Sequence, residues 1–164
     1  MRLARQVGPS GTVYAEDILP KFTKYIDERA KKEKLNNIRT ILGTTSDPKL
    51  PQNTLDAALI LNAYHEFDQP VTMLRHIYGA MKKGGLLGFI ERDTEELRSL
   101  ARRAYQSTGQ IKRRVDEKPD NNPYTDDHRL ALPVVEREAA LAGFTRVLSL
   151  ELNDDNYLLV VEKK

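Results

Sequence analysis

The stretch of sequence that decides the fold class is residues 55–90, LDAALILNAYHEFDQPVTMLRHIYGAMKKGGLLGFI. It contains two nearly continuous apolar runs, Leu55–Leu61 and Leu86–Ile90. Runs of this kind are typical of strands that are covered on both faces, as in a parallel sheet. Because parallel strands need a crossover connection, usually a helix, the segment between the two runs tests this interpretation.

That segment has the pattern of an amphipathic helix. Asp68 is placed as an N-cap, Pro70 fits the first helical turn, and Gly84-Gly85 would close the helix. Apolar residues at helical spacing mark its buried stripe: Val71, Leu74, Ile77, Tyr78 and Met81. The order strand, helix, strand therefore predicts one parallel α/β unit.

The flanking sequence extends this alternation in both directions. Toward the N-terminus, strands are predicted over 12–15 and 38–42, with a helix between them that begins at Pro20. Toward the C-terminus, Asp93 and Glu96 resemble a capping box that opens a helix. The remaining predicted elements are a polar loop over 112–129, a helix over 134–142, and an antiparallel hairpin of strands 145–152 and 157–161. The pattern predicts a single α/β domain over residues 1–164, with a mostly parallel sheet and an antiparallel C-terminal hairpin.

Composition narrows the classes of function. The chain has 164 residues, of which 40% are hydrophobic and 30% charged, and its formal net charge is +2. Because the charges nearly balance and acidic residues are interspersed, the sequence indicates no nucleic-acid partner and no membrane partner. The absence of cysteine excludes disulfides, thiolate metal ligands and a cysteine nucleophile. No apolar run has the length of a membrane helix or signal peptide, and we expect a cytoplasmic protein.

Several short segments carry a family resemblance through their order and spacing. They are LARQVGPSGTVYAEDI (3–18), LP (50–51), LD (55–56), NAYHE (62–66), MKKGG (81–85), DHR (127–129) and AGF (142–144). Together they resemble class I S-adenosylmethionine-dependent methyltransferases of the small-molecule branch. The resemblance covers nearly the whole chain. It implies a Rossmann-like sheet, S-adenosylmethionine (SAM) as cofactor and a small-molecule substrate.

The chain departs from the family pattern at its N-terminal end. The family's first strand and glycine-rich loop, which hold the methionine part of SAM, would stand before Leu3, and this sequence contains neither. Gly8 and Gly11 belong to the following turn and do not lie between a strand and a helix. We therefore expect a truncated Rossmann-like methyltransferase sheet with impaired SAM binding.

Polar residues at predicted strand ends are the candidate cofactor ligands. Asp17, or its neighbour Glu16, ends a strand at the edge where open α/β sheets bind ligands, and a carboxylate there suits the two ribose hydroxyls. The resemblance implies that Asp47 contacts the adenine amino group. Asn62 follows the apolar strand at the same kind of edge. The alternative is that the carboxylates cap helices and turns, because Ser-Asp-Pro is a common turn sequence.

The candidate catalytic residues are two histidines and a tyrosine. His65 and Tyr64 follow the apolar strand, and a histidine there suits removal of a proton from a substrate. The resemblance places His128 near the substrate. Two alternatives stay open for His65: a hydrogen bond at a helix start, or a metal site with Glu66 and Asp68. Three residues in one stretch define no coordination geometry, and we predict no metal site.

Three functions follow from these observations. The first is SAM-dependent methyl transfer, with Asp17 at the ribose, Asp47 at the adenine and His65 assisting deprotonation. The second is a non-catalytic module on the same scaffold. The third is a different enzyme, a hydrolase or metal-dependent catalyst, built around His65 or His128.

The resemblance also has a consequence for assembly. The strands over 12–15 and 55–61 would flank the family's first strand, and without it their edges are unpaired. Either the two strands pair directly in a narrower sheet, or a second copy of the chain covers the gap. We expect a homodimer or a higher homo-oligomer.

Overall fold

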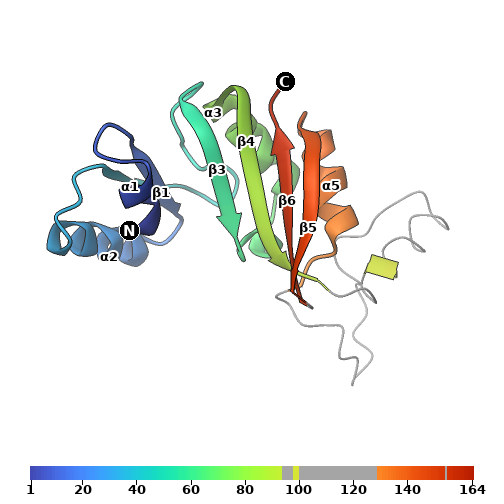
Figure 1. The fold of residues 1–164 in the computed structure, drawn as a ribbon, viewed down its shortest axis with the longest axis horizontal. Helices are drawn as coiled ribbons and strands as arrows, with labels where there is room; N and C mark the ends of the chain where they lie inside the picture. Colours follow the sequence, from blue (N-terminus) through green and yellow to red (C-terminus); the bar gives the residue numbers. More distant parts are fainter. Residues whose placement is uncertain (94–97, 100–128, 154) are drawn as a thin grey trace.

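The computed structural model describes residues 1–93, 98–99, 129–153 and 155–164 (Figure 1). Its elements are α1 (Arg2–Gln6), β1 (Val13–Asp17), α2 (Pro20–Lys32), β2 (Ile38–Leu42), β3 (Leu55–Leu61), the 3-10 helix η1 (Tyr64–Glu66), α3 (Pro70–Ala80), β4 (Met81–Arg92), α5 (Leu132–Leu141), β5 (Thr145–Asn153) and β6 (Asn156–Glu162). Glu96, His128 and nearly all of the loop predicted over 112–129 lie outside the described residues. Within the described part, no helix is long and apolar enough to cross a membrane.

The strands form two sheets. β1 and β2 pair in parallel, and the larger sheet has the order β3-β4-β6-β5. β3 and β4 are parallel, whereas β6 is antiparallel to both β4 and β5. The α/β class and the antiparallel C-terminal hairpin are therefore confirmed.

Direct pairing of β1 with β3 in a narrower sheet, one of the two alternatives from the sequence, is wrong. The chain between β2 and β3 is attached to the end of α3 instead. The Asn53 and Thr54 N–H groups donate to the carbonyls of Gly79 and Ala80 at 3.0 and 2.7 Å. These bonds fix the start of β3 against α3. Among the strands of the described residues, each of β1 and β3 has a neighbour on one side only.

The hydrophobic core lies between the larger sheet and the helices α3 and α5, which are behind the sheet in Figure 1. Burial alternates along the central strands, as the pleat requires. In β4, Leu87 and Phe89 point into the core, and in β6 Leu159 and Val161 do so. The helices and their flanking segments contribute Met73, Leu74, Ile77, Leu130, Val134, Val135 and Phe144.

The opposite face of the larger sheet carries two rows of mostly aliphatic residues. The strand registers align Leu59, Gly88, Val160 and Leu148 in one row, and Leu61, Ile90, Leu158 and Leu150 in the other. At the outer strands, Leu61 is 60% exposed and Leu150 is 54% exposed. Among the described residues no helix lies on this face (Figure 1). Monomeric proteins rarely expose a contiguous apolar surface of this kind.

The predicted ends of α3 are wrong at both termini. Gln69, not Asp68, is the N-cap, and no side-chain hydrogen bond caps the helix. The helix ends at Ala80, four residues before Gly84, because residues 81–85 join β4. The Gly84 N–H donates to the Lys163 carbonyl at 2.7 Å, and the Lys163 N–H donates to the Gly85 carbonyl at 3.0 Å. Pairing with the C-terminal chain therefore overrides the local helix pattern.

The N-terminal region, residues 1–42, is held together mainly by polar contacts. The Asn37 side chain donates to the carbonyls of Ala4 and Gly8 at 2.7 and 2.9 Å, which fastens α1 to the start of β2. Two large apolar side chains of α2 are exposed, Phe22 to 44% and Tyr25 to 57%. The helix α1 was not predicted, because its five residues are too few to show a periodic pattern.

Candidate active site

Glu16, near the C-terminal end of β1, has a buried carboxylate oxygen that no described group satisfies. Its Oε1 atom is inaccessible to solvent and accepts no hydrogen bond in the described structure. Burial, and secondarily the neighbouring charge of Asp17, raises the pKa of Glu16 to about 7. A Cβ atom on Gly43, the residue after β2, would overlap this oxygen and come within 3.2 Å of the Asp47 carbonyl. Glycine at position 43 therefore makes room for the carboxylate.

The carboxylates of Asp17 and Asp47 take part in local hydrogen bonds. The Leu19 N–H donates to Asp17 Oδ1 just before α2, and the Lys49 N–H donates to Asp47 Oδ1, both at 2.8 Å. Asp47 Oδ1 also lies 3.7 Å from His76 Nδ1 on α3. These are the capping and turn contacts of the alternative interpretation. Each carboxylate still has a second oxygen, and their roles at ribose and adenine stay predictions.

The residues after β3 form a second group of candidates. Asn62 has a left-handed backbone conformation (φ 47°), and its N–H donates to the Ile90 carbonyl at 2.7 Å, which turns the chain toward η1. Tyr64 is fully buried, and its ring packs edge-on against Phe67 and Phe89 with centroids 5.1 Å apart. The Tyr64 hydroxyl donates to the Glu138 carboxylate at 2.8 Å. The structure thus gives Tyr64 a packing role, and its catalytic role stays a prediction.

His65 is buried, with 5% of its surface exposed, and it lies beside Glu91 of β4. The sequence analysis did not single out Glu91. Glu91 is fully buried, and its Oε2 atom lies 2.8 Å from His65 Nδ1. Its Oε1 atom accepts the N–H groups of Ala63 and Tyr64 at 2.9 and 2.5 Å. The alternation of strand residues could have identified Glu91, because it puts an acidic residue on the same inward-facing side of β4 as Leu87 and Phe89.

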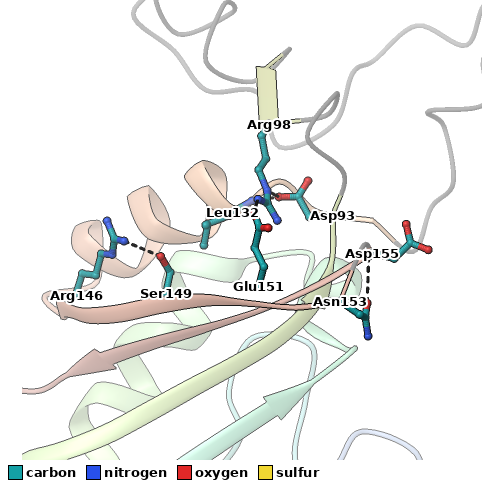
Figure 2. Close-up of polar contacts among 8 residues, drawn as sticks. All are labelled: Asp93, Arg98, Leu132, Arg146, Ser149, Glu151, Asn153 and Asp155. Carbon is teal, nitrogen blue, oxygen red and sulfur yellow. Dashed lines mark hydrogen bonds and ion pairs between the residues drawn. The ribbon is translucent and has the colours of Figure 1, made fainter.

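Asp93 lies two residues further along the same face and joins the end of β4 to α5 (Figure 2). It is fully buried, and its Oδ2 atom accepts Arg98 Nε at 2.7 Å and the Leu132 N–H at 2.9 Å. Arg98 also donates to the Glu151 carboxylate on β5. A buried acid needs such partners, because an unpaired buried charge is strongly destabilising. Asp93 therefore links the end of β4 to Arg98 and to the first residue of α5.

The charges of Glu91 and Asp93 act on a third buried group, Tyr157. Burial, and after it the nearby carboxylates of Glu91 and Asp93, raises the pKa of Tyr157 well above its ordinary value. Its hydroxyl donates to the Leu130 carbonyl at 3.1 Å and stays neutral. Within the described residues, no cluster of three or more histidine or acidic side chains is arranged to hold a metal ion.

Glu16 and Gly43 fit the nucleoside part of SAM. A ribose offers two hydroxyl donors, and the buried Glu16 Oε1 is an acceptor that no donor of the described residues satisfies. Gly43 keeps the adjoining position free of a side chain. Both lie at the C-terminal ends of parallel strands, where open α/β sheets bind their ligands.

Comparison with known proteins assigns the family. The model of the "Methyltransferase domain" family matches residues 1–89, which is more than half of the chain. The chain therefore belongs to the methyltransferase-domain family. It is 30% identical over 89 residues to a demethylmenaquinone methyltransferase of Geobacillus sp. (strain WCH70), and 29% identical over the same length to that of Anoxybacillus flavithermus. Each match covers 54% of this chain and 38% of the relative, so the chain spans well under half of these proteins.

Solved structures show the fold. A SAM-dependent methyltransferase from Aquifex aeolicus superposes with a TM-score of 0.74 at 20% identity, over 98% of this chain and 73% of that chain. The 4+2 cyclase SpnF superposes with a TM-score of 0.71 at 15% identity, over 99% and 70%. The Rossmann-like methyltransferase fold expected from the sequence is thus confirmed. Because one of these neighbours is described as a cyclase, the fold by itself does not fix the reaction.

Proposed function

We propose that this chain binds SAM at the C-terminal ends of β1 and β2 and transfers its methyl group to a small molecule. The observation that carries the proposal is the buried, unsatisfied Oε1 atom of Glu16. An unsatisfied buried acceptor is costly, and a ribose hydroxyl would supply the missing donor. Membership of the methyltransferase-domain family supports the reaction class.

Each candidate residue has a part in this proposal. Glu16 accepts the ribose hydroxyls, and the second oxygens of Asp17 and Asp47 orient the ribose and the adenine. When bound, SAM supplies an electrophilic methyl group on a positively charged sulfur. His65 takes the proton that the acceptor loses as it becomes a nucleophile. Holding the two reactants in line contributes most of the rate enhancement.

The relatives suggest the class of acceptor. They are named demethylmenaquinone methyltransferases, and we propose for this chain an acceptor related to that quinone, namely a hydroquinone, the two-electron-reduced form, supplied already reduced, whose ring becomes nucleophilic when a hydroxyl loses its proton. His65 is suited to remove such a proton. Catalysis by His128 and a cytoplasmic location stay predictions.

An NMR titration of the chain with SAM tests the cofactor site. We expect a weak dissociation constant of about 1 mM, equivalent to about −4 kcal/mol, because the 164 residues contain no glycine-rich loop to hold the methionine part. Glu16→Gln should weaken binding about tenfold, since it removes a charged acceptor. The control is Glu28→Gln on the exposed side of α2, which should bind as the parent does. Equal affinity of the Glu16 variant and the parent would remove Glu16 from the site, and micromolar binding would contradict the expected weakness.

We also propose that two copies of the chain associate through the open face of the larger sheet. Seven of the eight residues in its two cross-strand rows are aliphatic. Four strands of about seven residues form a sheet face with a flat area of roughly 400 Å², and the protruding side chains increase the surface that can be buried. Two copies packed face to face therefore bury roughly 800 Å² from the flat faces alone, and the side chains raise this toward the roughly 1,200 Å² of a stable interface.

Analytical ultracentrifugation tests this assembly. Leu150→Lys places a charge on the open face, in the row of Leu61, Ile90 and Leu158, and should weaken self-association at least tenfold. Leu141→Lys is the matched control, because Leu141 is also about half exposed (52%) but lies on α5, on the other side of the sheet. A parent chain that stays monomeric at high concentration would contradict the proposal.

A further inference from the structure

The two oxygens of the Glu91 carboxylate have different partners. Oε1 accepts two backbone N–H groups, those of Ala63 and Tyr64, at 2.9 and 2.5 Å. Oε2 faces only the His65 ring among its hydrogen bonds in the described structure, at 2.8 Å from Nδ1. The carboxylate is therefore fixed from one side by main chain, and it presents a defined oxygen to the histidine.

This arrangement determines where the proton of a neutral His65 ring resides. An ionised carboxylate only accepts hydrogen bonds, so Nδ1 must donate. A neutral imidazole carries one proton, and the lone pair then lies on Nε2. The exposed carboxylate of Glu66 also lies near the ring, and its Oε1 atom is 3.8 Å from Nε2, which is too long for a hydrogen bond.

We propose that Glu91 is a positioning residue that holds His65 in the tautomer with the proton on Nδ1 and the lone pair on Nε2. The consequence for catalysis rests on the proposed function. Nε2 takes the proton of the acceptor, and the resulting imidazolium remains paired with Glu91 at the short Nδ1 contact. The acceptor oxygen keeps the electron pair of its broken O–H bond. The tautomer itself does not depend on what the protein methylates.

The effect of Glu91→Gln on the tautomer can be predicted, because backbone N–H groups determine the orientation of the new side-chain amide. The two N–H donors of Ala63 and Tyr64 need an oxygen, so the amide oxygen takes the place of Oε1. The amide NH2 group then faces His65 Nδ1 and donates to it. Nδ1 must now accept, and the ring proton moves to Nε2. The substitution should therefore invert the tautomer while it preserves the shape of the site.

Nitrogen-15 NMR of the histidine rings measures this directly, because protonated and unprotonated ring nitrogens have well-separated shifts. The chain has three histidines, and His65→Gln assigns the His65 signals. We expect the Nδ1–H tautomer in the parent across the pH range in which the ring is neutral. We expect the Nε2–H tautomer in Glu91→Gln. The matched control is Glu66→Gln, which removes the carboxylate near the other nitrogen and should leave the parent's tautomer unchanged.

The parent spectrum alone can overturn the proposal, whether or not the variant folds. An Nε2–H tautomer in the parent contradicts it, and so does an unchanged tautomer in folded Glu91→Gln. Methyl transfer is measured separately, with SAM and 1,4-naphthohydroquinone as the probe acceptor. If the parent transfers methyl groups, Glu91→Gln should lower kcat at least 100-fold with little change in KM. Inversion of the tautomer without any methyl transfer by the parent would refute the proposed function and leave the positioning role of Glu91 intact.

Discussion

The N-terminal region (residues 1–42) and the region built on the larger sheet (residues 55–162) are stabilised in different ways. In the first, only Ala4 and Ala30 are buried, and side-chain contacts such as the 2.7 Å ion pair of Arg5 with Glu33 join its elements. The second contains the hydrophobic core between β4, β6, α3 and α5. Since burial of apolar surface is the main stabilising term, most of the stability of the described chain resides in the second region.

Two glutamates near strand ends show what this difference means for a polar group. Glu91 lies in the region with the core and has three hydrogen-bonding partners for its carboxylate. Glu16 lies in the N-terminal region, and its buried oxygen has none in the described structure. The first carboxylate is built into the fold, whereas the second has a buried oxygen that no described group satisfies, and on this oxygen the proposed ribose contact rests. Burial alone therefore does not indicate the role of an acidic side chain. The hydrogen-bond donors that surround its carboxylate are more informative.

The largest effect is expected for Glu91→Ala. The substitution leaves two N–H groups and a histidine nitrogen without their acceptor in a fully buried place. We expect the free energy of unfolding to fall by about 3–5 kcal/mol in urea denaturation. Glu66→Ala, whose side chain is 70% exposed, should change it by less than about 0.5 kcal/mol. A loss below about 1 kcal/mol for Glu91→Ala would mean that its three contacts are not part of the fold.

Hydrogen exchange compares the two regions without any substitution. Amides of β1 should exchange at least about 100-fold faster than the amides of β4 that pair with β6, which corresponds to about 2.7 kcal/mol of local stability. The physical reason is that β1 can open without exposing the main core. Equal protection in the two strands would show that the regions unfold as one cooperative unit.

A smaller effect, dependent on pH, is expected for Glu16→Gln. The folded pKa of Glu16 is about 7, above its ordinary value of 4.5, so the folded state disfavours the charged form. The free energy of unfolding therefore keeps its full value below about pH 4.5, and it decreases as the pH rises through 7. The variant cannot ionise, and at pH 8 it should be more stable than the parent by about 1 kcal/mol, after allowance for the solvent-exposed part of the side chain. At pH 4 the two proteins should be equally stable. A difference of the same size at both values would rule out titration as its cause.

The smallest effect concerns the contact of Gly43 with Glu16. An added Cβ at position 43 overlaps the flexible end of the Glu16 side chain, which can move aside, and it comes within 3.2 Å of the Asp47 carbonyl, which must shift by a few tenths of an ångström. Gly43→Ala should therefore change stability by only about 0.5 kcal/mol. The gain that Glu16→Gln produces at pH 8 should largely disappear in the Gly43→Ala background, because the displaced carboxylate regains solvent. A double-mutant cycle measures this coupling. Additive effects would mean that the two residues do not interact.

The sequence predicted the site less completely than the fold. Asp17, Asn62 and His65 were singled out because they follow predicted strands, a feature that local sequence displays, and Asp47 because of the family resemblance. Their roles stay predictions. Glu91 was missed, since its importance comes from Ala63, Tyr64 and His65, which are about 26–28 residues away along the chain. Asp93 was interpreted as a helix cap, and only the positions of Arg98 and Leu132 reveal its buried network.

By itself, the sequence determined the α/β class, the order of most elements and the antiparallel C-terminal hairpin. These follow from hydrophobic periodicity and turn residues, which act over a few neighbouring positions. Tertiary structure alone decided that α3 ends at Ala80, because pairing with Lys163 extends β4 backward. It also decided that β1 and β3 do not pair. In the part of the chain that the structure describes, it left a buried oxygen of Glu16 without a donor, whereas Asp17 accepts the Leu19 N–H. Each of these outcomes depends on hydrogen-bond partners that the fold supplies from elsewhere, and no local pattern can specify them.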